Sequence, residues 1–396
     1  MSLLPVEEAQ ARLLALAAPL PIETIPLLAA RGRPLAKPLV ALRDQPWADL
    51  SAMDGYAIRH ADLPGPWRLR GASRAGGARP TYELAAGEAM RIFTGAPMPG
   101  GADCVLVQEE ASVEGDHVRL SGDGPGAPGR NMRVHGSDFA VGKPILDVGC
   151  RLNPPQLAVA AMAGHAAIAV RRRPRIALIG SGDELAAIGT PLRDGQIPAS
   201  NGVMLAAMLE AAGAEVVDHG IVPDDLDMLT RAFRAASTAD AIVSTGGASV
   251  GDHDLVAPAI LAAGGALDFW KIAMRPGKPL MAGRLGDACV LGLPGNPVSA
   301  FVCATLFLLP LVRRLSGEAD PLPQWQEATT MVALPGGGTR AEYIRATVFD
   351  GEVRRITDRD SAALLPLAHA NALVERPAST LAASPGDRIR VLMLGD

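Results

Sequence analysis

Apolar residues in the middle of this chain fall into short runs that alternate with helical spacing. The run Ile176–Ile179 precedes a helical pattern over Val203–Ala212, which Gly213 closes. Two later apolar runs, Ala241–Ser244 and Cys289–Leu293, continue the series of strands. Strands that alternate with helices are typical of a sheet with right-handed crossovers. The pattern therefore predicts an α/β domain built on a mostly parallel sheet.

Two helices are predicted outside this series. The first twenty residues carry apolar positions at amphipathic spacing, and their early charges are acidic, unlike the basic start of a signal peptide. Ala300–Val312 is the longest apolar stretch, but it is shorter than the roughly 20 residues that span a bilayer, and it contains Pro310. We therefore predict an amphipathic helix at the N-terminus, a buried helix in the apolar stretch, and no contact with a membrane.

Elsewhere the apolar runs are short and separated by glycine and proline. Ala89–Phe93 is such a run in the first half of the chain, and Tyr343–Val348 is one near the end. Pro154-Pro155 opens a helical pattern between them. The predicted fold is multidomain, α/β plus β, with a central three-layer α/β domain (1–21 and 169–318), a helical and extended linker domain (22–40 and 141–168), a β-rich inserted domain (41–140) and a small C-terminal β domain (319–396).

Length and composition agree with several domains and exclude some functions. A chain of 396 residues exceeds the size at which a single hydrophobic core usually stops growing. Its net charge of -5 argues against general binding to nucleic acid, which depends on basic surfaces. The four cysteines lack the spacing of zinc or redox motifs, so we predict reduced thiols and a cytoplasmic location.

A glycine-rich loop follows the strand that ends at residue 244. Gly246 and Gly247 would let backbone N–H groups approach an anion, and Ser249 could add a hydroxyl. Asp252 and Asp254 would repel a bare anion, so their presence makes sense beside a phosphate if Mg²⁺ bridges the two. A simple glycine turn with solvated acidic side chains explains the same residues.

Two further loops follow predicted strands. Ser181 lies in a Gly-x-Gly turn that Asp183 and Glu184 follow. This is weak support for a site, because a structural turn with an acidic helix start looks the same. Pro294 and Asn296 lie at a strand end, where Asn296 is also explained as a helix cap. Because carboxyl ends of parallel strands share one edge, all three loops are expected to face one crevice.

Basic residues gather in the segment between the predicted strands Ala241–Ser244 and Cys289–Leu293. Lys271, Arg275 and Lys278 are spaced by Pro and Gly, which would fix their positions for a compact dianion. The alternative is a solvated basic loop with Trp270 packed in the core. In the predicted insertion, Asp54 and Thr94 each follow small or apolar neighbours, but Asp54 could simply cap a turn. Zinc-protease, nucleophile-elbow and P-loop motifs are absent from the sequence.

Six segments together resemble the MoeA family of molybdopterin molybdenumtransferases, which includes the E domains of gephyrin and of the plant insertase. They are SAMDGYA at 51–57, RIFTGAPMP at 91–99, GSGDEL at 180–185, STGGASVGDHD at 244–254, RPGKP at 275–279 and GLPGNPVSA at 292–300. Each segment alone is modest support. Their order and spacing match those of the family over almost the entire chain.

The resemblance implies an elongated four-domain subunit and a homodimer whose active site lies between the subunits. The family inserts molybdate into adenylylated molybdopterin with Mg²⁺, giving molybdenum cofactor and AMP in the last step of molybdenum cofactor biosynthesis. Other molybdenum cofactor enzymes are candidate partners. Matching positions give implied catalytic residues Asp54, Thr94, Asp138, Asp183, Glu184, Arg275 and Lys278, and implied metal ligands Asp252 and Asp254. Implied substrate-binding residues are Ser181, Asn201, Gly246, Gly247, Ser249, Lys271, Pro294, Asn296, Ser299, Arg345 and Ser361.

The chain departs from the family pattern at two positions. Ala199 stands where relatives commonly have Asp, and Ser137 stands where they commonly have Glu. Besides an insertase, two alternatives follow. One is an enzyme with a similar α/β domain, such as a pterin adenylyltransferase or a CinA-like protein acting on nicotinamide nucleotides. The other is a non-catalytic module that binds the pterin without releasing AMP.

Overall fold

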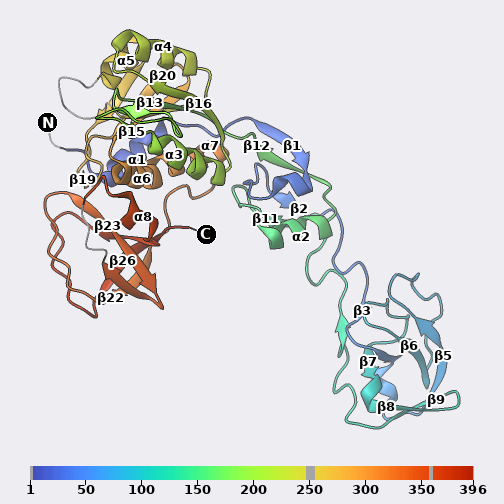
Figure 1. Ribbon diagram of the computed structural model, residues 1–396. Coiled ribbons are helices and arrows are strands. Elements are labelled where there is room, and N and C mark those ends of the chain that lie inside the picture. The colour runs from blue at the N-terminus through green and yellow to red at the C-terminus, as the bar shows by residue number, and fades with distance from the viewer. Residues whose placement is uncertain (1–2, 247–254, 356–359, 396) are drawn as a thin grey trace.

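The computed structural model describes residues 3–246, 255–355 and 360–395. The molecule is elongated, with an α/β unit and a C-terminal β unit at one end and a β-rich unit at the other (Figure 1). A narrow connecting unit lies between them, and the chain passes through it twice. The chain is thus multidomain, as the sequence predicts, although the predicted boundaries themselves stay predictions.

A six-stranded mixed sheet forms the α/β unit. Its strand order is β16 (Glu215–Val222), β13 (Arg175–Ser181), β17 (Ala241–Thr245), β21 (Ala288–Leu293), β20 (Met281–Leu285) and β18 (Ala266–Trp270). The first four strands are parallel, so the carboxyl ends of β13, β17 and β21 meet at one edge. The last two strands run antiparallel to their neighbours. The tight β20–β21 turn was not predicted from the sequence, and a turn this short can join only antiparallel strands.

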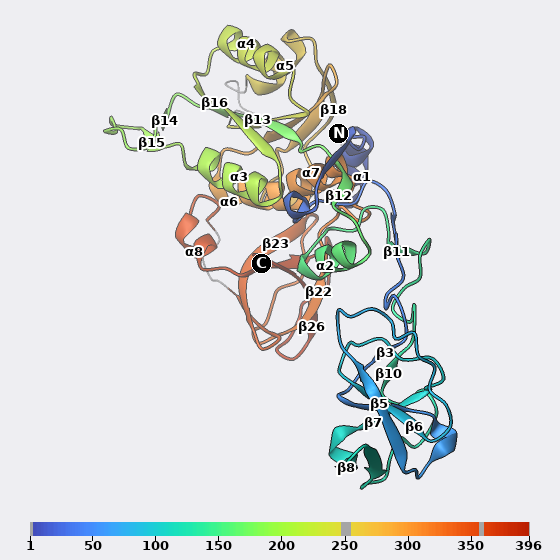
Figure 2. The same ribbon diagram turned by 90° about the vertical axis from the view of Figure 1, so that its right-hand side faces the viewer.

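Helices cover both faces of this sheet because buried residues alternate along its strands. Ile176 and Leu178 of β13 pack on one face, and Ala177 and Ile179 pack on the other. The first face carries α1 (Val6–Ala15), α3 (Ser200–Ala211), α6 (Pro297–Cys303) and α7 (Leu309–Ser316), and the second carries α4 (Leu226–Ala236) and α5 (Val256–Ala262). Figures 1 and 2 show α4 and α5 on the side of the sheet opposite α3 and α6.

The apolar stretch predicted as a buried helix is part of a longer helical segment, Pro297–Ser316. It consists of α6, a π-helical turn η4 (Ala304–Leu308) and α7. By length and composition this segment could cross a membrane, but most of it is buried inside the α/β unit. Pro310 lies in the first turn of α7 and does not end the helical segment.

The connecting unit is built from two antiparallel strand pairs and short helices. They are β1 (Ile22–Pro26) with β12 (Ala167–Arg171), β2 (Leu39–Val40) with β11 (Pro144–Leu146), the 3₁₀ turn η1 (Leu27–Ala30) and α2 (Pro154–Met162). Asn153 caps α2, where its side-chain oxygen accepts a hydrogen bond from the N–H of Gln156 at 3.3 Å. The unit has a small apolar core of its own.

The far unit is β-rich, as its short apolar runs predict. Its sheet has the order β7 (Cys104–Val107), β4 (Gly55–Ile58), β6 (Glu88–Ile92), β5 (Trp67–Ser73), β9 (His117–Leu120) and β8 (Ala111–Glu114). A short pair, β3 (Leu50–Ser51) with β10 (Met132–Arg133), lies where the chain enters and leaves the unit. Its helical elements are the single turns η2 (His60–Asp62) and η3 (Gln108–Glu110). We call this part the inserted unit.

The C-terminal unit is a small closed β-barrel. Its strands are β22 (Gln326–Thr330), β23 (Ala341–Phe349), β24 (Glu352–Arg355), β25 (Ala372–Arg376) and β26 (Arg388–Met393), with α8 (Leu364–Ala368) between β24 and β25. Closure results because β23 pairs with both β24 and β25. The basic segment of the α/β unit contributes β19 (Met274–Arg275), which pairs with β23. A short arm with β14 (Leu185–Ala186) and β15 (Ile197–Pro198) projects from the α/β unit (Figure 2).

Candidate functional site

Three loops meet at the carboxyl ends of β13, β17 and β21. Gly246 has a φ of +93°, and a Cβ atom there would lie 2.0 Å from the carbonyl oxygen of Ser181. A Cβ atom on Gly295 would lie 3.5 Å from the Cα atom of Gly246. The loops after three neighbouring strands therefore touch at the edge of the sheet where ligands of such folds bind. Position 246 requires glycine because any side chain would displace the Ser181 loop.

A cavity of about 940 Å³, here called the large cavity, opens beside these loops. Its walls mix apolar side chains, such as Leu185, Ile188 and Ile197, with loop backbone. Cavities of roughly 300 to 1,000 Å³ with this mixture are typical of small-molecule sites. The predicted site residues that line it are Ser181, Glu184, Asn201, Gly246, Pro294 and Asn296. Ala199 lines it as well.

Hydrogen bonds fix the polar groups of the large cavity. Asn201 donates from Nδ2 to the carbonyl oxygen of Gly295 at 2.7 Å, and its buried Oδ1 has no hydrogen-bond partner among the described residues. Ser181 donates from Oγ to Asp224 Oδ1 at 2.8 Å, and the N–H of Asp224 donates to Asp183 Oδ1 at 3.1 Å. Asp183 is exposed and lies outside the cavity lining. Its contact with Asp224 gives it a role in shaping this loop.

A second cavity, of about 280 Å³, here called the small cavity, lies between the basic segment of the α/β unit and strand β23 of the barrel. The predicted site residues that line it are Arg275, Lys278, Ser299, Arg345 and Ser361. Two further basic residues in its walls, Arg340 and Arg355, were not predicted from the sequence. Five basic side chains thus line the cavity, against the single carboxylate of Glu342. This charge balance suits a small anion.

Arg345 holds one wall of the small cavity in place. Its side chain is buried and donates from Nη1 to the carbonyl oxygen of Ala363 at 2.8 Å and from Nη2 to that of Asp360 at 3.1 Å. These bonds fix the short segment that carries Ser361. The predicted substrate-binding residue Arg345 therefore also positions a second predicted residue.

The two cavities are neighbours. Pro279 lines both of them. Asn296 of the large cavity donates from Nδ2 to the hydroxyl of Ser361 in the small cavity at 3.0 Å. The carbonyl oxygen of Ser361 accepts from the N–H of Val298 at 3.0 Å. A ligand in one cavity therefore lies beside a ligand in the other, with Asn296 and Ser361 at the border.

Lys271, predicted to bind substrate, lies outside the lining of both cavities. Its ammonium group lies 4.9 Å from the centre of the Trp270 ring, a cation–π contact. Trp270 is 37% exposed, so the alternative in which this ring packs in the core is wrong. Lys271 has a φ of +74°, in the left-handed region that non-glycine residues seldom adopt.

Asp54 and Thr94 of the inserted unit lie in direct contact. The N–H of Thr94 donates to Asp54 Oδ1 at 2.7 Å, and the Thr94 hydroxyl donates to the same oxygen at 2.8 Å. These two bonds lower the pKa of Asp54 below its ordinary value, with a smaller contribution from the charge of Arg91. The sequence indicated each residue separately, whereas the fold makes them a pair.

The inserted unit lies at the opposite end of the molecule from both cavities (Figure 1). Asp54 and Thr94, which flank β4 and β6, are therefore not brought to the cavities by their own chain. Asp138 is exposed on the connection between the inserted and connecting units, where its N–H donates to the carbonyl oxygen of Gln45 at 2.9 Å.

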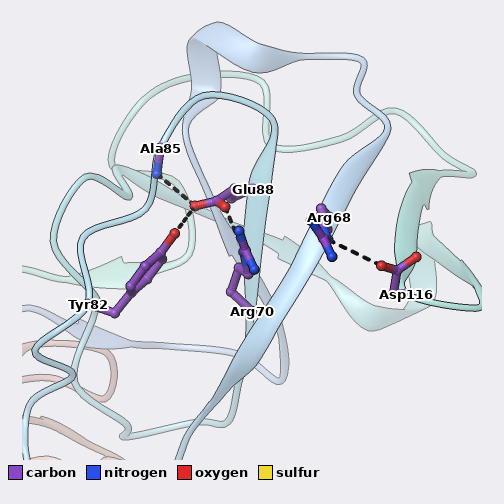
Figure 3. Close-up of polar contacts among 6 residues, drawn as sticks. All are labelled: Arg68, Arg70, Tyr82, Ala85, Glu88 and Asp116. Atoms are coloured by element: carbon purple, nitrogen blue, oxygen red, sulfur yellow. Dashed lines mark hydrogen bonds and ion pairs between the residues drawn. The ribbon is translucent and has the colours of Figure 1, made fainter.

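A buried carboxylate, Glu88, organises the rim of the inserted unit (Figure 3). The Tyr82 hydroxyl and the N–H of Ala85, the latter at 3.1 Å, donate to Glu88 Oε2. The Nε of Arg70 donates to Glu88 Oε1 at 2.6 Å. The Tyr82 bond and then the Arg70 bond lower the pKa of Glu88 to about 2. Glu88 therefore stays ionised and ties the loop before β6 to strand β5.

Some predicted site residues lie outside the described part of the chain. They are Gly247, Ser249, Asp252 and Asp254.

All four cysteines lie within the described part and are unpaired, and three of them are buried. Burial raises the pKa of the Cys104 thiol to about 12, so this thiol stays protonated at neutral pH.

Comparisons with known proteins cover nearly the whole chain. Family models match residues 4–164 (MoeA N-terminal region, domain I and II), 177–314 (Probable molybdopterin binding domain) and 327–394 (MoeA C-terminal region, domain IV). The molybdopterin molybdenumtransferase of Nostoc sp. is 35% identical over 94% of this chain and 88% of its own length. That of Haemophilus influenzae is 36% identical over 84% of this chain and 81% of its own length.

Solved structures give the same result. The crystal structure of a molybdopterin biosynthesis MoeA protein from Pyrococcus horikoshii has a TM-score of 0.86 and 27% identity, covering 99% of this chain and all of that one. Since the family models match most of its length and a relative 35% identical spans nearly all of it, the chain belongs to the MoeA family.

Proposed function

We propose that this protein inserts molybdate into adenylylated molybdopterin and releases molybdenum cofactor and AMP. Its relatives from Nostoc sp. and Haemophilus influenzae are named molybdopterin molybdenumtransferase, which supports a transferase of molybdenum cofactor biosynthesis. The observation that carries the proposal is the basic small cavity beside the large cavity, with Asn296 and Ser361 in contact at the border. An anion and an organic acceptor could react across this border.

The small cavity is the proposed molybdate site. Molybdate is a tetrahedral dianion, and charge-assisted hydrogen bonds from Arg275 and Lys278 would balance it. Ser299 and Ser361 would add hydroxyl donors from the same walls. Such bonds are stronger in a partly desolvated cavity than in water, because the effective dielectric constant is lower.

The large cavity is the proposed site of the adenylylated pterin. Its apolar walls suit the flat ring systems, and the loops of Ser181, Gly246 and Gly295 offer backbone groups to the polar parts. With its dithiolene sulfurs at the border, the pterin would lie next to molybdate. The protein would then act by positioning the two reactants, which replaces a bimolecular encounter with a local one. No side chain is assigned as a nucleophile.

Magnesium dependence is a further proposal that follows from the family. Asp252 and Asp254, the implied ligands, lie outside the described residues. The described residues contain no cluster of three or more side chains that could hold a metal ion. When bound, Mg²⁺ would neutralise charge on the diphosphate.

We also propose that a second copy of the chain completes the site. Asp54 and Thr94 form an ordered pair at the far end of the elongated molecule, away from both cavities. In a homodimer, the inserted unit of one subunit could reach the cavities of the other. This arrangement is testable, because mixing an Asp54→Asn chain with a Lys278→Ala chain should restore activity through mixed dimers that contain one intact site. If subunit exchange is confirmed but activity is not restored, a shared site is contradicted.

A pterin-binding module without turnover is the second candidate, and Ala199 favours it. Ala199 lines the large cavity, and the resemblance to the family implies Asp at this position. Such a module would bind the adenylylated pterin and hold it without releasing AMP.

One assay separates the two candidates. Purified protein is incubated with adenylylated molybdopterin, molybdate and Mg²⁺, and AMP is measured by chromatography while cofactor is measured by activation of a molybdenum-free apoenzyme. We expect both products to form in equal amounts. Tight pterin binding without AMP would reject the insertase and support the binding module.

A further inference from the structure

The side chain of Arg91 lies against two aromatic rings of the inserted unit. Arg91 on β6 pairs directly with Tyr56 on β4, so their side chains share one face of the sheet. Its guanidinium carbon lies 5.0 Å from the centre of the Tyr56 ring and 4.9 Å from that of Phe93. A planar guanidinium can stack on aromatic rings and still donate hydrogen bonds from its edge.

The edge of this guanidinium bonds two other segments. Nη1 donates to the carbonyl oxygen of Gly55 at 3.1 Å, and Nη2 donates to Gln108 Oε1 at 2.7 Å. The N–H of Gln108 in turn donates to the carbonyl oxygen of Asp54 at 3.1 Å. Arg91 therefore contacts the residue that follows Asp54 and the residue that holds the Asp54 backbone.

The same side chain reaches the other member of the pair. Phe93, whose ring stacks on Arg91, directly precedes Thr94. Thr94 places both of its donors on Asp54 Oδ1, and among the described residues no hydrogen bond reaches Oδ2. The second carboxylate oxygen thus stays available to a ligand, provided that the two loops keep their relative position.

We propose that Arg91 is the positioning residue of Asp54, holding the Asp54 and Thr94 loops together so that Oδ1 is occupied and Oδ2 is presented to substrate. The catalytic meaning of this role rests on the function proposed above. Lysine could not replace arginine here, because an ammonium group lacks the planar fork that stacks on two rings and bonds two acceptors at once.

A first test needs no enzymatic activity. The side-chain carboxyl of Asp54 is titrated by ¹³C NMR in the full-length protein, with Asp54→Asn identifying its signal. Arg91→Lys keeps the positive charge, so a change in the titration midpoint reports geometry. We expect the midpoint to rise toward the ordinary aspartate value as the Thr94 bonds weaken. An unchanged midpoint in folded Arg91→Lys protein would overturn the proposal.

Two other variants make this test decisive. Arg68→Lys is the matched control, because Arg68 lies in the same sheet and pairs with Asp116 at 3.2 Å (Figure 3), apart from Asp54. We expect no change of the Asp54 midpoint in this variant, and an equal change would mean a general effect of arginine loss. Should Arg91→Lys fail to fold, Gln108→Ala removes one anchor of Arg91 at an exposed position, and it should raise the midpoint in the same direction.

A second test measures turnover. Arg91→Lys should lower kcat for AMP release about 10- to 100-fold, as misplacement of a reacting group does, with little change in KM. In the Asp54→Asn background the same substitution should add almost no further loss, because both act through one carboxylate. An equal loss in both backgrounds would reject positioning through Asp54. Absence of AMP release from the wild-type chain would reject the proposed function, while the titration would still decide the role of Arg91.

Discussion

The side-chain amide of Asn296 donates a hydrogen bond to the hydroxyl of Ser361 at 3.0 Å, and this contact joins the walls of the two cavities. Asn296 precedes the first residue of α6, whereas Ser361 belongs to the C-terminal unit and is held there by Arg345. The border between the proposed molybdate and pterin sites is therefore an interface between two units of the fold. Changes at this border should affect both ligands.

Asn296→Ala tests the border directly. The substitution removes one neutral hydrogen bond, so we expect molybdate affinity to fall about 2- to 10-fold, in line with roughly 0.5 to 1.5 kcal/mol for such a bond. Ser361→Ala should cost a similar amount, and the double variant should lose less than the sum of the two. Isothermal titration calorimetry with molybdate measures these values. Asn153→Ala, which removes the cap of α2 in the connecting unit, serves as control and should leave molybdate binding unchanged.

Lys278→Ala should separate the two ligands. Lys278 lines the small cavity and not the large one, so we expect molybdate affinity to fall roughly 10- to 100-fold, the range for a hydrogen bond from a charged group. Affinity for the adenylylated pterin should change far less. Lys143→Ala, at an exposed position of the connecting unit, controls for the loss of one positive charge. Equal losses for both ligands would contradict the assignment of the cavity.

Ala199→Asp should change stability and turnover for different reasons. Ala199 is the N-cap residue of α3 and offers no side-chain cap, so Asp should add about 0.5 to 2 kcal/mol to the free energy of unfolding. We also expect faster AMP release, because the new carboxylate would face the large cavity. Denaturant unfolding and the AMP assay measure the two effects. Ala199→Asn, which caps without charge, should stabilise α3 without the gain in rate, and equal rates for the two variants would contradict a role for the carboxylate.

The low pKa of Glu88 predicts that the stability of the inserted unit depends on pH. Its pKa is about 2 in the folded chain and near its ordinary value of 4.5 when unfolded, because Tyr82 and Arg70 favour the ionised form. The resulting stability is fully present above pH 4.5 and is lost as the pH falls toward 2. The wild-type chain should therefore have a higher Tm than the Glu88→Gln variant at neutral pH. This difference in Tm should become smaller as the pH falls from 4.5 to 2. A constant gap across this range would show that the ionised carboxylate is not the cause.

Local pattern alone was sufficient for much of the fold. The apolar runs at Ile176–Ile179, Ala241–Ser244 and Cys289–Leu293 all lie within parallel strands. The helix predicted at Val203–Ala212 is α3, which starts earlier, at Ser200. These elements are predictable because strand and helix periodicity are properties of neighbouring residues. The β20–β21 hairpin was missed because β20 carries no comparable run of apolar residues.

Tertiary structure decided which residues share a site. Arg340 and Arg355 enter the small cavity because β19 pairs with β23 and β23 pairs with β24, a register that no local pattern specifies. The same fold leaves Lys271 over the Trp270 ring, although it lies near Arg275 in sequence. The motifs by themselves determined the family and the kinds of side chain available. Distances between side chains depend on contacts between residues far apart in the chain, and for this reason only the folded chain could pair Asp54 with Thr94 and Asn296 with Ser361.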